Sequence, residues 1–307
     1  LLYSRFFMKA IKLTNNKINC AEPFKNLFTQ GMVCHETYKD LNDNWLYPNE
    51  IEKTSDKEAV KKKDNSKVLI GASESMSKSK KNTIDPEIMI KQYGADSVRW
   101  FILSDSPPEK DIQWSDSGVV SSSKFLQKIW NLNLTVINRK DQIVDEGLQK
   151  KFEDKINIYI FKIDSAINHF QFNVAIAQFY EIYRYFNDAL KLKISKNTLE
   201  TNLIRVMKMM IPFIPHLAHE CLFKLNCQDI NKWPKVDKKA MEDSEIKLVV
   251  QINGKTRDVL NMKRNLPEGE VDIVVKKSNK VKKYIENKKI SKTIFVKNKI
   301  INYIVNN

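Results

Sequence analysis

Cysteine and histidine are scarce in this chain of 307 residues, which contains four of each. The cysteines, Cys20, Cys34, Cys221 and Cys227, form no Cys-x-x-Cys pair, and no histidine stands at zinc-finger spacing from them. Scattered thiols of this kind are typical of proteins kept reduced inside the cell. The sequence therefore predicts neither a disulfide nor a metal site, zinc included.

The sequence also lacks an apolar run of about 18 residues, the length needed to cross a membrane. A positively charged start leading into a short apolar stretch and a cleavage site is missing as well. Hydrophobic residues make up 42% of the chain, which is enough for ordinary cores, and its length predicts more than one domain. We expect a cytoplasmic protein with no membrane partner.

Positive charge, by contrast, is abundant. Lysine and arginine number 52 against 37 aspartate and glutamate, a net charge of +15, and residues 231–307 hold 19 basic and 9 acidic residues. A basic tail attracts polyanions through counterion release, which makes RNA a natural partner. The alternative is compositional: the chain is lysine-rich throughout, and many of these lysines would then be ordinary solvated surface.

The stretch best suited to chemistry runs from Met76 to Asn82. It places the hydroxyls of Ser77 and Ser79 and the ammonium of Lys78 on a short loop without an apolar face. A lysine that reaches phosphates chiefly in the transition state lowers the barrier to transfer of a phosphoryl-linked group. Taken alone, a Ser/Lys-rich stretch is more often a solvated loop.

With its context, this stretch resembles a known family. Residues 76–82 are similar to the Lys-Met-Ser-Lys-Ser signature of class I aminoacyl-tRNA synthetases, and residues 83–86 and 93–99 resemble the segment downstream of that signature in the leucine, isoleucine and valine enzymes. Residues 1–7, 22–33, 250–257 and 295–302 narrow the resemblance to leucyl-tRNA synthetases of the bacterial type. The resemblance spans the chain.

Two departures from the family pattern bear on activity. Ser75 stands where the family has its first signature lysine, with Glu74 before it, and the four histidines include no His-Ile-Gly-His-type motif. In the family that motif holds ATP from the side opposite the signature loop. We therefore expect a carboxy-terminal portion of such an enzyme, which does not activate leucine on its own.

The resemblance implies a chain of mixed α/β and all-α parts. Residues 1–84 would be the end of a class I nucleotide-binding, Rossmann-like core, with a small polar insertion at 35–72 and the signature loop at 75–79. Residues 85–230 would form a helical, anticodon-binding-type bundle. Residues 231–307 would form a small basic α/β domain that binds tRNA.

The resemblance also implies a site and its ligands. Lys78 would be catalytic, and Met76, Ser77, Lys78 and Ser79 would bind ATP, which is expected to come with Mg²⁺. Lys255 and Arg257, just past a predicted hairpin, are the candidate tRNA contacts. The implied partners are tRNA(Leu), with leucine and ATP in the complete enzyme and a separately encoded amino-terminal half as a candidate.

Three alternatives stay open at this point. The chain could be a non-catalytic tRNA- or RNA-binding module, which the basic tail supports. It could be an inactive gene fragment, for which the missing signature lysine is weak support. It could also be a portion of an isoleucyl- or valyl-tRNA synthetase, although residues 251–257 disfavour this alternative.

Local patterns predict individual elements. They indicate a helix over residues 1–13, a strand at 31–33, and a helix capped by Asp85, opened by Pro86 and stopped by Gly94. Apolar residues recur at helical spacing in 125–137, 172–190 and 203–221, the last stretch crossing two prolines. From Ile246 the period changes to two, and Asn253-Gly254 is a hairpin signal. Strands at 271–275 and 293–296 and a helix near 280–289 would complete the tail.

Overall fold

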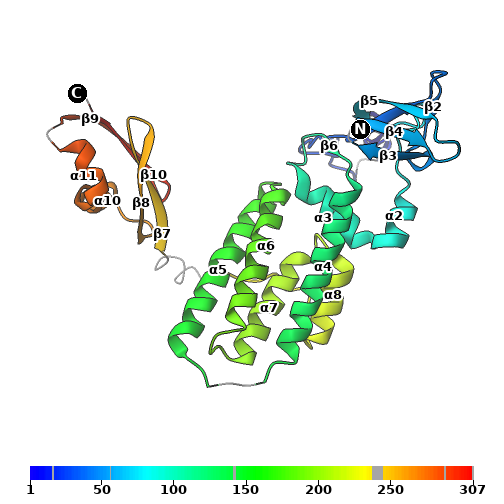
Figure 1. The fold of residues 1–307 in the computed structure, drawn as a ribbon. Coiled ribbons are helices and arrows are strands. Elements are labelled where there is room, and N and C mark those ends of the chain that lie inside the picture. The colour runs from blue at the N-terminus through cyan, green and yellow to red at the C-terminus, as the bar shows by residue number, and fades with distance from the viewer. Residues whose placement is uncertain (16, 56, 141–142, 237–244, 287, 306–307) are drawn as a thin grey trace. The chain divides into compact units, whose positions relative to one another are not determined.

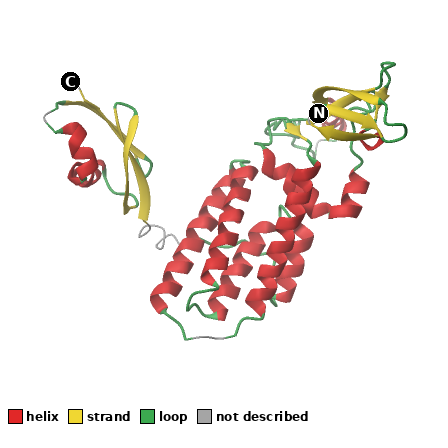
Figure 2. Ribbon diagram, viewed as in Figure 1, coloured by secondary structure: helices red, strands yellow, loops and turns green. Residues whose placement is uncertain are grey.

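A computed structural model describes residues 1–15, 17–55, 57–140, 143–236, 245–286 and 288–305 (Figure 1). The chain divides into two compact units. The first consists of Leu1–Lys124 with Phe170–Asn173, and the second of Phe125–His169 with Val174–Asn307. Helices and sheets both occur, so the mixed α/β class expected from the sequence is confirmed (Figure 2).

The first unit is organised around a largely antiparallel sheet. Its strands are β1 (Val33–Lys39), β2 (Trp45–Leu46), β3 (Ile51–Ser55), β4 (Glu58–Lys61) and β5 (Lys67–Ser75), in the order β2-β1-β5-β4-β3. A short strand, β6 (Ile112–Gln113), pairs with β1 in parallel, and a 3-10 turn, η1 (Pro48–Glu50), follows β2. The segment expected to be a polar insertion is thus mostly strand, and it has a small core of its own: Tyr38, Leu46, Ile51, Ala59 and Val68.

One helix precedes the strands of this sheet in the sequence, and two helices lie between β5 and β6. Helix α1 (Leu2–Thr14) matches the expected helix, and within the described chain none of its residues is buried. Helix α2 (Pro86–Tyr93) begins as predicted, because the Asp85 side chain accepts a hydrogen bond from the Glu87 backbone N–H at 2.9 Å. It ends at Gly94, whose φ of +83° favours glycine. Helix α3 (Ala95–Asp105) follows directly.

The helical bundle is built from α4 (Asp116–Ile137), α5 (Glu146–Asn168), α6 (Phe172–Ala189), α7 (Lys196–Met210) and α8 (Pro215–Lys224), which run alongside one another (Figure 1). Sequence patterns predicted α4 and α6 but overlooked α5. They also treated 203–221 as one bent helix, which was wrong. The chain leaves helical hydrogen bonding after Met210, and α8 starts at Pro215, because proline suits a first turn and breaks an interior one.

Large apolar side chains fill the bundle. Phe152, Phe179 and Phe186 are almost fully buried, and the Phe152 and Phe186 rings meet edge to face at 5.2 Å. None of the helices that the structure describes is both long enough and apolar enough to span a membrane.

The carboxy-terminal part folds around a four-stranded sheet of order β8-β7-β10-β9. Its elements are β7 (Glu245–Ile252), β8 (Lys255–Lys263), α10 (Glu268–Lys277), α11 (Asn279–Ile285), β9 (Ile290–Val296) and β10 (Ile300–Val305). The predicted hairpin is confirmed, since Asn253 and Gly254 both have positive φ, +50° and +76°. The strand expected at 271–275 was wrong, because these residues lie within α10. Residues 237–244, which join this part to the bundle, lie outside the described residues.

Candidate functional site

The predicted signature residues lie on the loop between β5 and α2. The strand ends at Ser75, the position where the resembled family has a lysine, and α2 starts at Pro86. The loop leaves the sheet with a backbone hydrogen bond from Met76 N–H to the Val33 carbonyl, 3.0 Å long. It then turns at residues 78–81, where Lys81 adopts a positive φ of +52°. The sheet and the helix therefore fix both ends of the loop.

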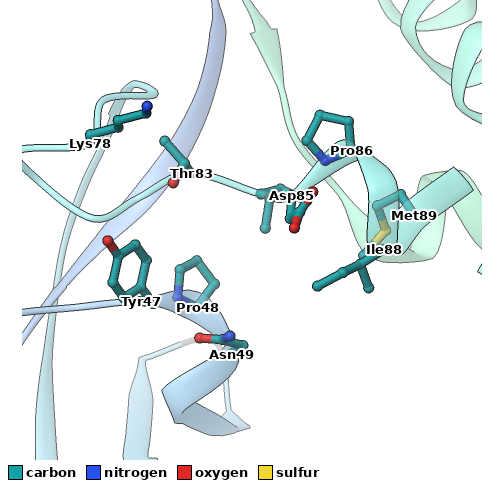
Figure 3. Close-up of a pocket in the computed structure, with 10 residues that line it drawn as sticks. Tyr47, Pro48, Asn49, Lys78, Thr83, Asp85, Pro86, Ile88 and Met89 are labelled. Carbon is teal, nitrogen blue, oxygen red and sulfur yellow. The ribbon is translucent and has the colours of Figure 1, made fainter.

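A cavity of about 500 Å³ opens beside this loop (Figure 3). Figure 3 shows Lys78 and Thr83 on the loop, across the cavity from Tyr47, Pro48 and Asn49 of the segment after β2. Residues at the start of α2 line the far end of the cavity, and they include Asp85, Pro86, Ile88 and Met89. Lys78, which the sequence analysis predicted to bind phosphate, thus lines a cavity.

The loop lysines differ in their surroundings. The Lys80 ammonium forms an ion pair with the Glu74 carboxylate. The Lys81 ammonium lies over the Tyr47 ring, 5.3 Å from its centroid. Lys78 is exposed and makes no ion pair with any residue that the structure describes. The negative charge of Glu74 is therefore balanced locally, and the charge of Lys78 remains available to a ligand.

The loop hydroxyls bond mainly to the loop itself. The Ser77 and Ser79 hydroxyl oxygens are 3.2 Å apart, and the Lys80 backbone N–H donates to the Ser77 hydroxyl at 3.4 Å. Met76 is half-buried. These contacts give Ser77 a role in shaping the turn that carries Lys78.

One residue of the site was not anticipated. Asn82 ends the turn and is fully buried, and its amide oxygen accepts a hydrogen bond from the Ser77 backbone N–H at 2.8 Å. The sequence held a signal for it, since an asparagine beside a turn commonly hydrogen-bonds to nearby backbone.

The two candidate tRNA contacts lie at the start of β8. Lys255 is exposed. Arg257 is the extra residue of a β-bulge, since Gln251 pairs with Thr256 and Val250 with Asp258. The bulge directs the Arg257 guanidinium over the Tyr284 ring of α11, 4.2 Å from the centroid. Three exposed lysines lie on α11, the helix that carries Tyr284: Lys280, Lys282 and Lys283.

His219 of α8 has an ordinary helical contact. The His219 ring bonds through Nδ1 to the Pro215 carbonyl at 2.7 Å. In the part of the chain that the structure describes, no three His, Cys, Asp or Glu side chains gather closely enough to hold a metal ion.

Comparison with known proteins relates these parts to a family. Residues 65–115 match the family described as tRNA synthetases class I (I, L, M and V), and residues 149–275 match the anticodon-binding domain of tRNA ligase. Leucine–tRNA ligases of Rickettsia massiliae (strain Mtu5) and Rickettsia conorii (strain ATCC VR-613 / Malish 7) are 39% and 40% identical to this chain over 99% of its length. The chain spans 37% of the length of each relative.

A solved structure shares the fold. The Agrobacterium radiobacter K84 agnB2 LeuRS, determined as a ternary complex with tRNA and LeuAMS, superposes with a TM-score of 0.71 at 24% identity. All of this chain and 36% of that one are covered.

The two family matches, which include the signature loop and most of the bundle, assign these parts of the chain to the class I tRNA synthetases. Within that class the chain corresponds to a carboxy-terminal portion of the leucine–tRNA ligases. This confirms the resemblance drawn from the signature and its flanks, and it disfavours the isoleucyl and valyl alternatives.

Proposed function

We propose that this chain supplies the phosphate-gripping loop and part of the tRNA-binding surface for leucylation of tRNA(Leu). The observation that carries the proposal is that the exposed Lys78 lines a cavity, on a loop whose nearby carboxylate, that of Glu74, is already paired with Lys80. A cation placed in this way meets the negative charge of a triphosphate.

The chemistry explains why a lysine is suited to this position. In the first step a leucine carboxylate oxygen attacks the α-phosphorus of ATP, the bond to the bridging oxygen breaks, and leucyl-adenylate and pyrophosphate form. Negative charge grows on the departing pyrophosphate, and Lys78 stabilises it most in the transition state. In the second step a hydroxyl of the terminal adenosine of tRNA takes the leucyl group, and AMP leaves.

Magnesium enters this proposal with the nucleotide. Mg²⁺ is commonly held through substrate phosphates and water, with few protein carboxylates. Met76, Ser77 and Ser79 shape the turn, and Lys78 meets the oxygens of the phosphates.

The proposal includes a complementary part. The chain spans 37% of its relatives, so the pocket for leucine and the opposite wall of the ATP site come from further sequence, in the same chain or in a separate one. We propose that this chain alone does not activate leucine and that the reaction takes place in the cytoplasm.

Leucine-dependent exchange of pyrophosphate into ATP tests the role of Lys78. The chain is combined with the remaining portion of a Rickettsia relative, and wild type is compared with Lys78→Ala. Loss of one charge-stabilising donor should slow adenylate formation by roughly one to three orders of magnitude, with little change in leucine affinity. An unchanged rate would remove Lys78 from the mechanism.

For tRNA we propose the surface formed by Lys255, Arg257, Tyr284 and the α11 lysines. A guanidinium stacked on an aromatic ring beside several ammonium groups is suited to a phosphate backbone and to exposed bases. Asp258 weakens this positive surface little, because its carboxylate accepts from the Ser278 hydroxyl at 2.6 Å and lies 3.5 Å from the Lys280 ammonium.

Salt-dependent binding of a tRNA(Leu) transcript tests this surface. Lys255→Ala should weaken binding and reduce the slope of log affinity against log salt by about one, the loss expected for one phosphate contact. Arg257→Lys keeps the charge but loses the planar stack on Tyr284, so it should weaken binding as well. Lys191→Ala, on an exposed bundle lysine paired with Asp188, is the control. Binding of tRNA without restored aminoacylation would favour the non-catalytic module.

A further inference from the structure

Asn82 uses its side-chain amide to close the base of the signature loop. It is 0% exposed. Its Oδ1 accepts from the Ser77 N–H at 2.8 Å, and its Nδ2 lies 3.1 Å from the Glu74 carbonyl and 3.2 Å from the His35 carbonyl. A weaker contact of 3.4 Å reaches the Ser75 carbonyl. One side chain therefore joins the loop to the ends of two adjacent strands, β5 and β1.

Two hydrogen bonds within the loop are longer than the bond that Asn82 accepts from Ser77. The Lys81 N–H donates to the Lys78 carbonyl at 3.3 Å, and the Lys80 N–H donates to the Ser77 hydroxyl at 3.4 Å. Both exceed the usual length of such a bond, about 2.9–3.0 Å. The turn that carries Lys78 thus depends on Asn82 for its short hydrogen bond to Ser77, the residue next to Lys78.

We propose that Asn82 is the positioning residue of Lys78, which means that its amide sets where the lysine ammonium stands on the cavity wall. The inference rests on the proposed function, in which Lys78 meets phosphates. Asn82 itself touches no ligand, because its side chain is buried and points toward the strands. It acts by holding the Ser77 N–H and thereby the backbone that carries Lys78.

A general structural role makes a different prediction from a positioning role. If Asn82 only stabilises the fold, its loss should weaken every property of this unit whether or not Lys78 is present. If Asn82 acts through Lys78, its loss should weaken phosphate binding only while the Lys78 ammonium is there to be misplaced.

The experiment measures binding of inorganic tripolyphosphate to the full chain by calorimetry at low salt. The proteins are wild type, Lys78→Ala, Asn82→Ala and the double variant, with Asn42→Ala on an exposed residue of the same unit as the control. Asn82→Asp is added because it keeps the acceptor for Ser77 but turns a carboxylate toward the carbonyls of Glu74 and His35. Hydrogen exchange at the Ser77 amide and thermal unfolding are measured for each protein.

We expect Lys78→Ala and Asn82→Ala each to reduce the affinity several-fold, and Asn82→Ala to have little further effect once Lys78 is absent, which is the non-additivity of two residues acting as one unit. Exchange at Ser77 should speed up more in Asn82→Ala, which loses the acceptor, than in Asn82→Asp, which keeps it, and thermal unfolding should show that both variants are folded at the titration temperature. The Asn42 control should match wild type.

Two results overturn the inference and leave the function standing. One is an unchanged affinity in Asn82→Ala. The other is an equal loss of affinity with and without Lys78. If Lys78→Ala itself binds tripolyphosphate as wild type does, the proposed function fails instead, and the positioning role fails with it.

Discussion

The Glu74–Lys80 ion pair determines how much positive charge the signature loop presents to a phosphate ligand. Glu74→Gln should release the Lys80 ammonium and raise the affinity for tripolyphosphate, whereas Lys80→Gln should expose the Glu74 carboxylate and lower it. The double variant, Glu74→Gln with Lys80→Gln, carries the same net charge as wild type and should bind like it. These three proteins form a matched set.

The expected size follows from the exposure of the pair. The two side chains are 38% and 43% exposed, so the pair itself contributes at most about 1 kcal/mol to stability and its removal should leave the fold intact. A unit charge roughly 8 Å from a phosphate, in an effective dielectric of about 40–80, changes the binding free energy by about 0.5–1 kcal/mol, or two- to fivefold in affinity. The effect should shrink at high salt because the charges are screened.

Calorimetric titration at about 25 mM and about 250 mM salt measures this effect, since the screening length falls roughly threefold between these two concentrations. The two single variants should shift the affinity in opposite directions at low salt and converge at high salt. A shift in the same direction for both would mean that the pair acts through loop geometry. No shift in either would mean that phosphate does not approach this loop.

Three further predictions concern the rest of the chain. Phe186→Ala, at a fully buried site in α6, should cost about 3–5 kcal/mol of stability, seen as an earlier thermal loss of helical circular dichroism; Phe223→Ala, at a 71% exposed site in α8, should change stability by less than about 0.5 kcal/mol. Burial raises the pKa of the Cys221 thiol to about 12, so a maleimide at pH 8 should label exposed Cys20 at once and Cys221 only after unfolding. The pKa of Asp40 is lowered to about 2, chiefly because its carboxylate accepts a hydrogen bond from the Asn44 backbone N–H. This folded-state pKa lies below the unfolded value, so Asp40 stabilises the fold above about pH 4, and that stability is lost as the pH falls through 2. Asp40→Asn should remove this part of the acid dependence of unfolding.

Short-range signals predicted the elements that adjoin the site. The cap at Asp85, the proline after it and Gly94 act within a few residues, so they indicated α2 correctly without tertiary information. The Asn253-Gly254 turn was predictable for the same reason, since positive φ at both positions is a local requirement.

Elements decided by packing were less predictable. Residues 271–275 are rich in valine and isoleucine, which favours a strand, yet Val271 and Val275 lie four residues apart and both face the core from α10. Acidic residues in the first turn of that helix and lysines in its last turn support it electrostatically. Helix α5, by contrast, was overlooked although its sequence predicts a helix. Its buried apolar residues follow helical spacing: Phe152, Ile156, Ile160 and Ile163.

The balance of charge at the site could not be predicted from the sequence. Glu74 before the signature suggested a repulsive charge near phosphates, because the sequence does not say which lysine a carboxylate will meet. Its partner is six residues away, across a turn whose shape depends on hydrogen bonds made by a buried asparagine.

The way the loop is held bears on how Lys78 reaches its ligand. The structure fixes the loop at its start through Met76 and Ser77 and at its end through the Asp85 cap on α2. A backbone held at both ends over so short a distance has little freedom to move as a whole, whereas the lysine stem has four rotatable bonds. We therefore favour a mechanism in which the Lys78 side chain extends to the departing pyrophosphate from a fixed backbone, because that contact forms as charge develops and needs no loop closure.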